Sequence, residues 1–217
     1  MTGQPARLER TWRLGIAAAV LLLLTAAAPP SPPGASAAVD PNWPCQQIKI
    51  DHMSLVTMWS GPPLEKYLDD WQHYPAAAAL AQRLAERRVP VTQAQAEITA
   101  FAKAAGDQRQ TAILALMGGL FSLLDQERFA VVQGLDRFGA RQQSYAAQIR
   151  DEITALHTAQ DAPQPDQPEV TKLSGQVDWD TRVFADRKSM IAYACFVPDE
   201  IEHRLYQLAG TASNLLP

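Results

Sequence analysis

Apolar positions recur every three or four residues over a long stretch in the middle of the chain. The members of this series are Leu120, Leu124, Val131, Leu135, Phe138, Tyr145, Ile149, Ile153 and Leu156. This spacing aligns the apolar side chains along one stripe of a helix and leaves the charged and amide residues on its other faces. We therefore expect one long helix that packs at a shallow angle on a partner helix. The stripe either closes within the chain or leaves a face for another protein. In the second case, the interaction face consists of Leu135, Phe138, Tyr145, Ile149 and Leu156.

The long helix is expected to begin in the most hydrophobic stretch that follows the first forty residues. This stretch runs from Thr111 to Leu124 and is interrupted by Gly118 and Gly119. It is too short to cross a bilayer, which takes about 20 residues. The stretch therefore predicts a buried core helix, in which the two glycines act either as a hinge or as a site of close helix packing.

A second apolar stripe follows a proline-rich break. Residues 161–170 contain three prolines and cannot continue the helix, so a turn or exposed linker is expected there. Apolar residues then recur at helical spacing at Leu173, Val177, Phe184, Ile191 and Cys195. If the linker reverses the chain, the two stripes face each other in an antiparallel helical hairpin.

Shorter helices are expected on both sides of the hairpin. Residues 64–74 and 75–88 each show a helical pattern, and Thr92 and Gln95 have the spacing of a capping box for a helix that stops at Gly106. A last helix should run from Pro198 to about Leu208.

These elements predict an all-α fold: an elongated antiparallel helical hairpin packed with several shorter helices. Residues 39–63, rich in Pro and Trp, should form an N-terminal arm with one short helical turn, and residues 64–217 a single helical domain.

The first 38 residues have the order of a secretory signal peptide. Three arginines precede an apolar run from Leu14 to Ala28, and small residues then lead to Ala38. The run is shorter than a typical spanning helix, which favours a cleaved signal over a retained anchor. We expect a periplasmic or secreted protein that does not span the membrane after cleavage.

The sequence has two cysteines, Cys45 and Cys195. An even number of cysteines in an exported chain predicts a disulfide, with two free thiols or a bond to another chain as the alternatives. A disulfide would fasten the N-terminal arm to the C-terminal part of the domain.

The expected mature chain is acidic. Three of the 19 basic residues and one of the 23 acidic residues lie in the first 38 positions, which leaves 16 basic against 22 acidic residues and a net charge of −6. Nucleic acids and anionic membrane surfaces both attract clustered Lys and Arg, so neither is expected as the main partner.

Two groups of residues have types found in metal sites. His52, Met53 and Met58 offer soft ligands of the kind that copper accepts. Glu200 and His203 have the Glu-x-x-His spacing of di-iron helical bundles, but those sites need a second such motif and two further glutamates. They are alternatives to our main expectation, which includes no cofactor.

An enzyme without a recognisable motif is a further alternative. Asp69, Asp70 and His73 fall on one helical turn, where a carboxylate can orient an imidazole as a general base. The chain contains no glycine-rich phosphate loop, nucleophile elbow or zinc-protease motif. We therefore favour a protein that is not an enzyme.

The two ends of the chain carry distinctive residues. They read Asp40-Pro-Asn-Trp-Pro-Cys45-Gln-Gln and Met58-Trp-Ser-Gly-Pro62 near the start, then Tyr193-Ala-Cys195-Phe-Val-Pro198 and Glu202-His-Arg-Leu-Tyr-Gln-Leu208 near the end. These ends resemble uncharacterised exported helical proteins of Gram-negative bacteria. The resemblance covers the ends alone and implies no activity.

The functional hypothesis from the sequence is a non-catalytic periplasmic protein. Its helical hairpin would dock on another protein, and the chain would serve as an accessory or adaptor subunit, or as an assembly factor, of a membrane-associated complex. The alternatives are a small-ligand or copper-binding protein and an enzyme without a motif.

Overall fold

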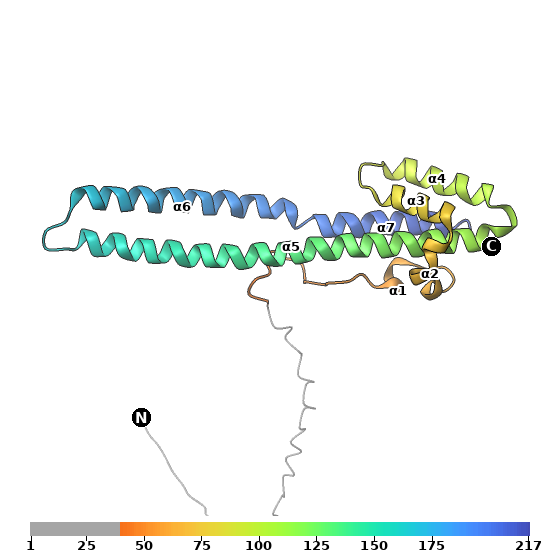
Figure 1. Cartoon of the computed structure of the whole chain (residues 1–217), viewed down its shortest axis with the longest axis horizontal. Coiled ribbons are helices and arrows are strands. Elements are labelled where there is room, and N and C mark those ends of the chain that lie inside the picture. Colours follow the sequence, from red (N-terminus) through yellow and green to blue (C-terminus); the bar gives the residue numbers. More distant parts are fainter. Residues whose placement is uncertain (1–39) are drawn as a thin grey trace, which may run out of the picture. The chain divides into compact units, whose positions relative to one another are not determined.

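One long helix, α5 (Arg109–Gln160), organises the fold (Figure 1). The computed structural model describes residues 40–217, so the signal peptide expected at residues 1–38 lies outside the described residues. Helix α5 has 52 residues and is therefore about 78 Å long. Helices α6 (Gln167–Ala194) and α7 (Val197–Ser213) follow one another back along α5 in the opposite direction. The prediction of an all-α fold built on an antiparallel hairpin is confirmed.

Shorter helices surround the first half of α5 and, together with α7, form what we call the head. They are α1 (Leu55–Met58), α2 (Glu65–Asp70), η1 (Trp71–His73), α3 (Pro75–Ala85), α4 (Val91–Ala104) and η2 (Gly106–Gln108). The head contains most of the buried apolar side chains, including Leu84, Ile98, Ile113, Leu116, Leu120, Leu124, Ile201, Leu205 and Leu208. Every residue from 113 to 120 is buried, which confirms that the most hydrophobic stretch forms a core helix.

Gly118 and Gly119 are sites of close packing, not a hinge. Helix α5 runs through them without interruption. A Cβ atom at Gly118 would collide with the backbone carbonyl of Tyr67, and one at Gly119 would lie 2.9 Å from side-chain atoms of Ala81 and Trp71. The two glycines therefore let α2, η1 and α3 approach α5 closely.

Several predicted boundaries differ from the structure. The linker is shorter than residues 161–170, because α6 already begins at Gln167 and has Pro168 in its first turn, where proline needs no hydrogen-bond partner. The predicted capping box is wrong, because α4 begins at Val91 and Thr92 lies inside the helix with no side-chain cap. Helix α7 continues to Ser213, beyond the expected end near Leu208. Gly106 does end α4, with a φ of 52° that favours glycine.

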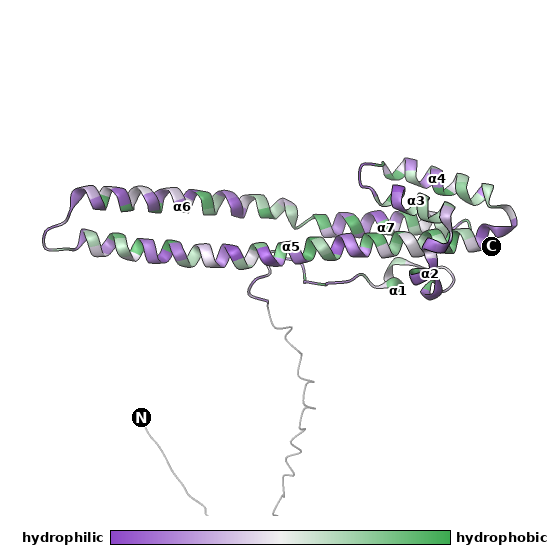
Figure 2. Cartoon of the chain, in the orientation of Figure 1, coloured by the Kyte–Doolittle hydropathy of each residue, from purple (hydrophilic) through white to green (hydrophobic). Residues whose placement is uncertain are grey.

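The second half of α5 and α6 extend away from the head as a pair of helices (Figure 1). We call residues 136–160 together with α6 the stalk. Helix α6 contains no fully buried residue, and beyond residue 139 only Ile149 of α5 is buried. Hydrophilic residues cover much of the stalk in Figure 2. Two helices alone cannot enclose a core, so the stalk has far less buried apolar surface than the head.

None of the helices in residues 40–217 combines the length and the hydropathy needed to span a bilayer.

Candidate interaction surface

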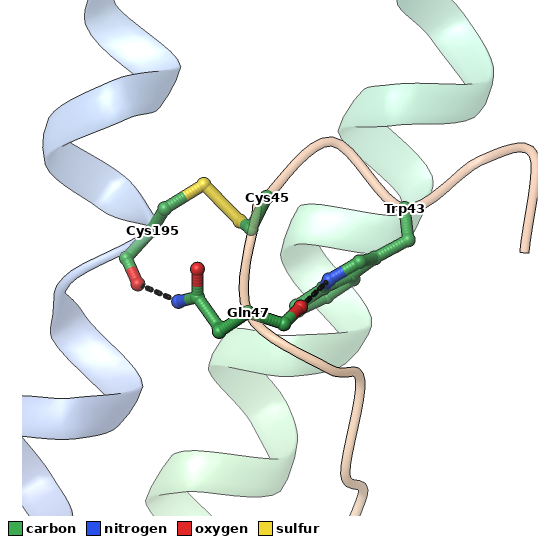
Figure 3. The surroundings of a disulfide bond; sticks show 4 residues. All are labelled: Trp43, Cys45, Gln47 and Cys195. Atoms are coloured by element: carbon green, nitrogen blue, oxygen red, sulfur yellow. Dashed lines mark hydrogen bonds between the residues drawn. A yellow bond between two sulfur atoms is a disulfide. The ribbon is translucent and has the colours of Figure 1, made fainter. Parts of the chain in front are cut away.

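A disulfide between Cys45 and Cys195 joins the N-terminal arm to the end of α6, where the stalk meets the head (Figure 3). The Cα atoms lie 5.6 Å apart across 150 residues of sequence. The side-chain amide of Gln47 donates a hydrogen bond to the carbonyl oxygen of Cys195, and the indole N–H of Trp43 donates to the carbonyl oxygen of Gln47 over 2.6 Å. The predicted disulfide is confirmed, and it indicates an oxidising environment.

Charged side chains also hold the N-terminal arm on α5. The Nζ atom of Lys49 lies 2.7 Å from a carboxylate oxygen of Asp40 and 2.9 Å from one of Asp136. Hydrogen bonds to the two carboxylates raise the pKa of Lys49, and the Lys49 ammonium lowers the pKa of Asp40. The arm crosses α5 at Gly139, where a Cβ atom would collide with the carbonyl oxygen of Asn42.

Two buried arginines connect separate parts of the chain, and the sequence reasoning missed both. Arg128 donates to Glu202 on α7 over 2.6 Å and to the carbonyl oxygen of Ile50 over 2.5 Å. Arg204 donates to the carbonyl oxygens of Leu84, at 2.7 and 3.0 Å, and Val89, at 2.8 Å. Burial lowers the pKa of Arg204. Both arginines stand at positions where the helical spacing of apolar residues would place an apolar side chain. This spacing could have indicated that they are buried.

The five residues predicted as an interaction face lie within the chain's own hairpin. Leu135 and Ile149 are buried, and the other three, Phe138, Tyr145 and Leu156, are half-buried. Their helical stripe is the one that meets α6. The stripe on α5 therefore closes internally, and a free surface of the stalk must lie elsewhere.

Tyr145 shows how the two stalk helices are joined. Its hydroxyl donates to a carboxylate oxygen of Asp180 over 2.6 Å, its ring centroid lies 6.5 Å from that of Phe184, and the Arg187 guanidinium lies 4.9 Å from the centre of its ring. The hydrogen bond to Asp180 raises the pKa of Tyr145. The phenol therefore stays protonated and keeps this donor at physiological pH.

Large apolar side chains line the outer face of α6. Trp179 and Met190 are each 65% exposed, and Tyr193 is 80% exposed. Met190 lies eleven positions after Trp179, and Tyr193 lies three positions after Met190, so all three lie on one side of the helix. We call these three residues the outer stripe. They lie about a third of a turn around the helix from Asp180 and Phe184, which contact α5. Exposed Phe196 follows at the end next to the disulfide.

The residues considered as metal ligands are engaged in other contacts or lie apart. The Nδ1 atom of His52 lies 2.8 Å from Asp125, and its ring stacks on Phe129. Met53 is buried, and Met58 packs against the core. Glu200 and His203 border a shallow hollow on the exposed side of α7. Residues 40–217 contain no group of three or more His, Cys, Asp or Glu side chains placed to hold a metal ion.

The residues considered for catalysis lie on the surface of the head. Asp69 and His73 are exposed, and Asp70 is partly exposed. The Nδ1 atom of His73 is 3.7 Å from a carboxylate oxygen of Asp70, which is longer than a hydrogen bond.

An apolar hollow of about 460 Å³ lies on the head between α3, α4 and the start of α5. Alanines, Pro75 and the rings of Tyr74 and Phe101 form most of its wall, and Gln108 and Thr111 add polar groups. Its volume falls within the range of pockets that hold small molecules.

Comparisons with known protein families, curated proteins and solved structures give no match for this chain.

Proposed function

We propose that this chain is a non-catalytic accessory or adaptor protein whose stalk binds another protein chain. The observation that carries the proposal is the outer stripe of α6. A single exposed apolar residue is common on protein surfaces and needs no explanation. Three large side chains aligned on one helix face, two of them aromatic, have the composition and arrangement of a helix-binding surface.

The stalk is well suited to present such a surface. Its helices extend beyond the head, so a partner can reach the outer face of α6 without contacting the head's core (Figure 1). The contacts of Tyr145 with Asp180, Phe184 and Arg187 hold α6 in place and fix the direction of the outer stripe. A surface held in place before binding loses less conformational entropy when the partner arrives.

We place the protein in the periplasm or outside the cell, with a cleaved signal peptide. The disulfide supports an oxidising compartment, and the order of residues in the first 38 positions supports export. An exported adaptor that is released from its signal can serve a complex at the outer side of the membrane. The acidic charge of the mature chain makes a protein a better candidate partner than nucleic acid or an anionic lipid surface.

Co-purification with stalk variants tests this function. The full chain is recovered from native membranes under mild conditions, and its companions are identified by mass spectrometry. Trp179→Glu places a charge in the outer stripe, so we expect it to remove the companions of the wild-type protein. Tyr206→Glu is the matched control, because Tyr206 is a 60% exposed aromatic residue on α7 of the head. The proposal fails if both variants retain the same companions, or if the wild-type protein has none.

The apolar hollow on the head favours a second candidate function, the binding of a small apolar ligand such as a fatty acyl chain. A fluorescent fatty acid should become brighter when it binds the purified protein. Ala104→Phe fills the hollow and should abolish the signal, whereas Ala100→Phe, on the same helix outside the hollow, should preserve it. Equal signals from the two variants would remove this candidate.

A further inference from the structure

We infer that the partner of the outer stripe is a second copy of this chain, bound antiparallel along α6. This inference rests on the proposed function, because it names what the stalk binds. Its grounds are the unpaired outer face of α6, the distribution of charge along that helix and the register of its exposed residues.

Helix α6 lacks a partner on its outer side. It packs on α5 along one side only and contains no fully buried residue in its 28 positions. Pairing the outer faces of two α6 helices joins two hairpins into a four-helix arrangement and encloses Trp179, Met190 and Tyr193. A two-fold axis relates the two copies, so each copy buries the same face of α6.

The charges of α6 are divided between its two halves. Residues 167–180 contain three acids and one base, namely Glu169, Asp178, Asp180 and Lys172. Residues 181–194 contain three bases and one acid, namely Arg182, Arg187, Lys188 and Asp186. The net charges are therefore −2 and +2. Asp180 and Arg187 contact Tyr145 on α5, and without these two residues the halves carry −1 and +1. An antiparallel pair places each acidic half beside a basic half, whereas a parallel pair places like charges together.

The exposed residues share one antiparallel register. A two-fold axis beside residue 184 sets Arg182 of each copy opposite Asp186 of the other. The same register brings Trp179 of each copy to within one residue of the position opposite Met190. Within residues 40–217, neither Arg182 nor Asp186 forms an ion pair with another side chain, so both are available for this contact.

Gly175 fits the same register. It lies on the outer side of α6, opposite Tyr193 of the second copy, and no atom lies within 4 Å of the position that a Cβ would occupy. The missing side chain leaves room for the tyrosine ring, which is 80% exposed in the single chain. The contacts of Trp179 with Met190 and of Gly175 with Tyr193 thus lie at both ends of the interface. The two symmetry-related Arg182–Asp186 pairs lie between them.

The resulting dimer has a head at each end, because the two stalks run in opposite directions. In this register Gln167 of each copy lies level with Ile201 of the other, so the stalk tip reaches the start of α7 and the rest of the head stays free. Such a dimer can bridge two partners or hold two sites of one complex at a separation set by the stalks.

Analytical ultracentrifugation of the purified full chain, with its disulfide intact, tests this inference over a range of concentrations. We expect the wild-type protein to form a dimer. Arg182→Asp and Asp186→Arg should each weaken the dimer about tenfold or more, because the two-fold axis repeats each like-charge contact. The double variant Arg182→Asp/Asp186→Arg restores both pairs in reversed order and should recover the wild-type affinity to within a few-fold.

Tyr206→Glu is the control for a general effect of surface substitution, and circular dichroism checks that each variant keeps its helices. A wild-type chain that is monomeric at every concentration overturns the inference, as does a double variant no tighter than the single ones. If the chain is monomeric but Trp179→Glu still removes a different companion protein from native membranes, the self-association fails and the proposed function stands.

Discussion

Arg204 shows how one residue can hold the head together from within. Its guanidinium donates three hydrogen bonds to the carbonyl oxygens of Leu84 and Val89, at the end of α3 and in the loop that follows. Arg204→Met leaves these carbonyls without a donor, and we expect it to lower the free energy of unfolding by about 2–4 kcal/mol. Arg204→Lys keeps the charge but loses the planar fork, so its effect should be intermediate.

Urea unfolding measures these differences. Arg88→Met is the control, because Arg88 is exposed and its only ion pair within residues 40–217 is with Glu86, and its effect should stay within about 0.5 kcal/mol. An Arg204→Met variant that unfolds at the same urea concentration as Arg88→Met would show that the buried guanidinium contributes no net stability.

Gly139 and Gly134 form a natural matched pair on α5. A Cβ at Gly139 would collide with the carbonyl oxygen of Asn42, whereas the nearest atom to a Cβ at Gly134 is 4.0 Å away, on the flexible side chain of Arg137. Gly134→Ala should stabilise the protein by up to about 1 kcal/mol, the helix-propensity gain. Gly139→Ala should destabilise it by about 1–3 kcal/mol, because the N-terminal arm must shift. Thermal unfolding measures the stability of the two variants. Equal stabilisation by Gly134→Ala and Gly139→Ala would contradict the close crossing of the N-terminal arm over α5.

Some of these residue roles were visible in the sequence. Only two cysteines are present, so their pairing was the simplest arrangement. The buried arginines lie in apolar stripes, but a sequence pattern cannot show that the carbonyl oxygens of Leu84 and Val89 converge on Arg204. Those contacts depend on the tertiary placement of α3 against α7.

At the scale of elements, α5 and α6 differ in how their stability arises. Residues 113–120 of α5 are buried in the head, whereas α6 contains no fully buried residue. Few buried contacts permit local opening. Amides of α6 should therefore exchange with solvent faster than those of residues 113–124, and Tyr145→Phe should accelerate exchange in α6 without affecting the head. Hydrogen exchange with mass spectrometry measures both, and uniform protection along α5 and α6 would contradict the division into head and stalk.

The helical pattern predicted the hairpin because a long apolar stripe needs a second helix to cover it. The strongest stripe, with Tyr145 and Ile149, packs against α6 inside the chain, so the surface that we propose for binding lies elsewhere. The exposed apolar residues lie on α6, where Trp179 and Met190 are separated by three helical turns. The spacing of Trp179 and Met190 on α6, rather than the longer apolar series on α5, indicated where the exposed apolar residues lie.

At the scale of the whole molecule, the disulfide fixes the place where the stalk leaves the head. It closes a loop of 150 residues, which in the chain-entropy model contributes up to about 5 kcal/mol. Arg128 joins three parts of the chain, since it lies on α5 and bonds to the N-terminal arm and to α7. A covalent and a polar connection thus hold the base of the stalk, while its outer face stays exposed.

Photo-crosslinking in living cells tests most directly whether the outer face of α6 is the protein-binding surface. A photoreactive amino acid replaces Met190 on the outer stripe in one variant and Tyr206 on the head in another, two positions with similar exposure. We predict that the residue at position 190 gives discrete crosslinked bands, to a second copy of the chain or to another protein, and that the residue at position 206 does not. Crosslinks of equal strength from both positions, or none from position 190, would contradict the assignment of α6 as the binding surface.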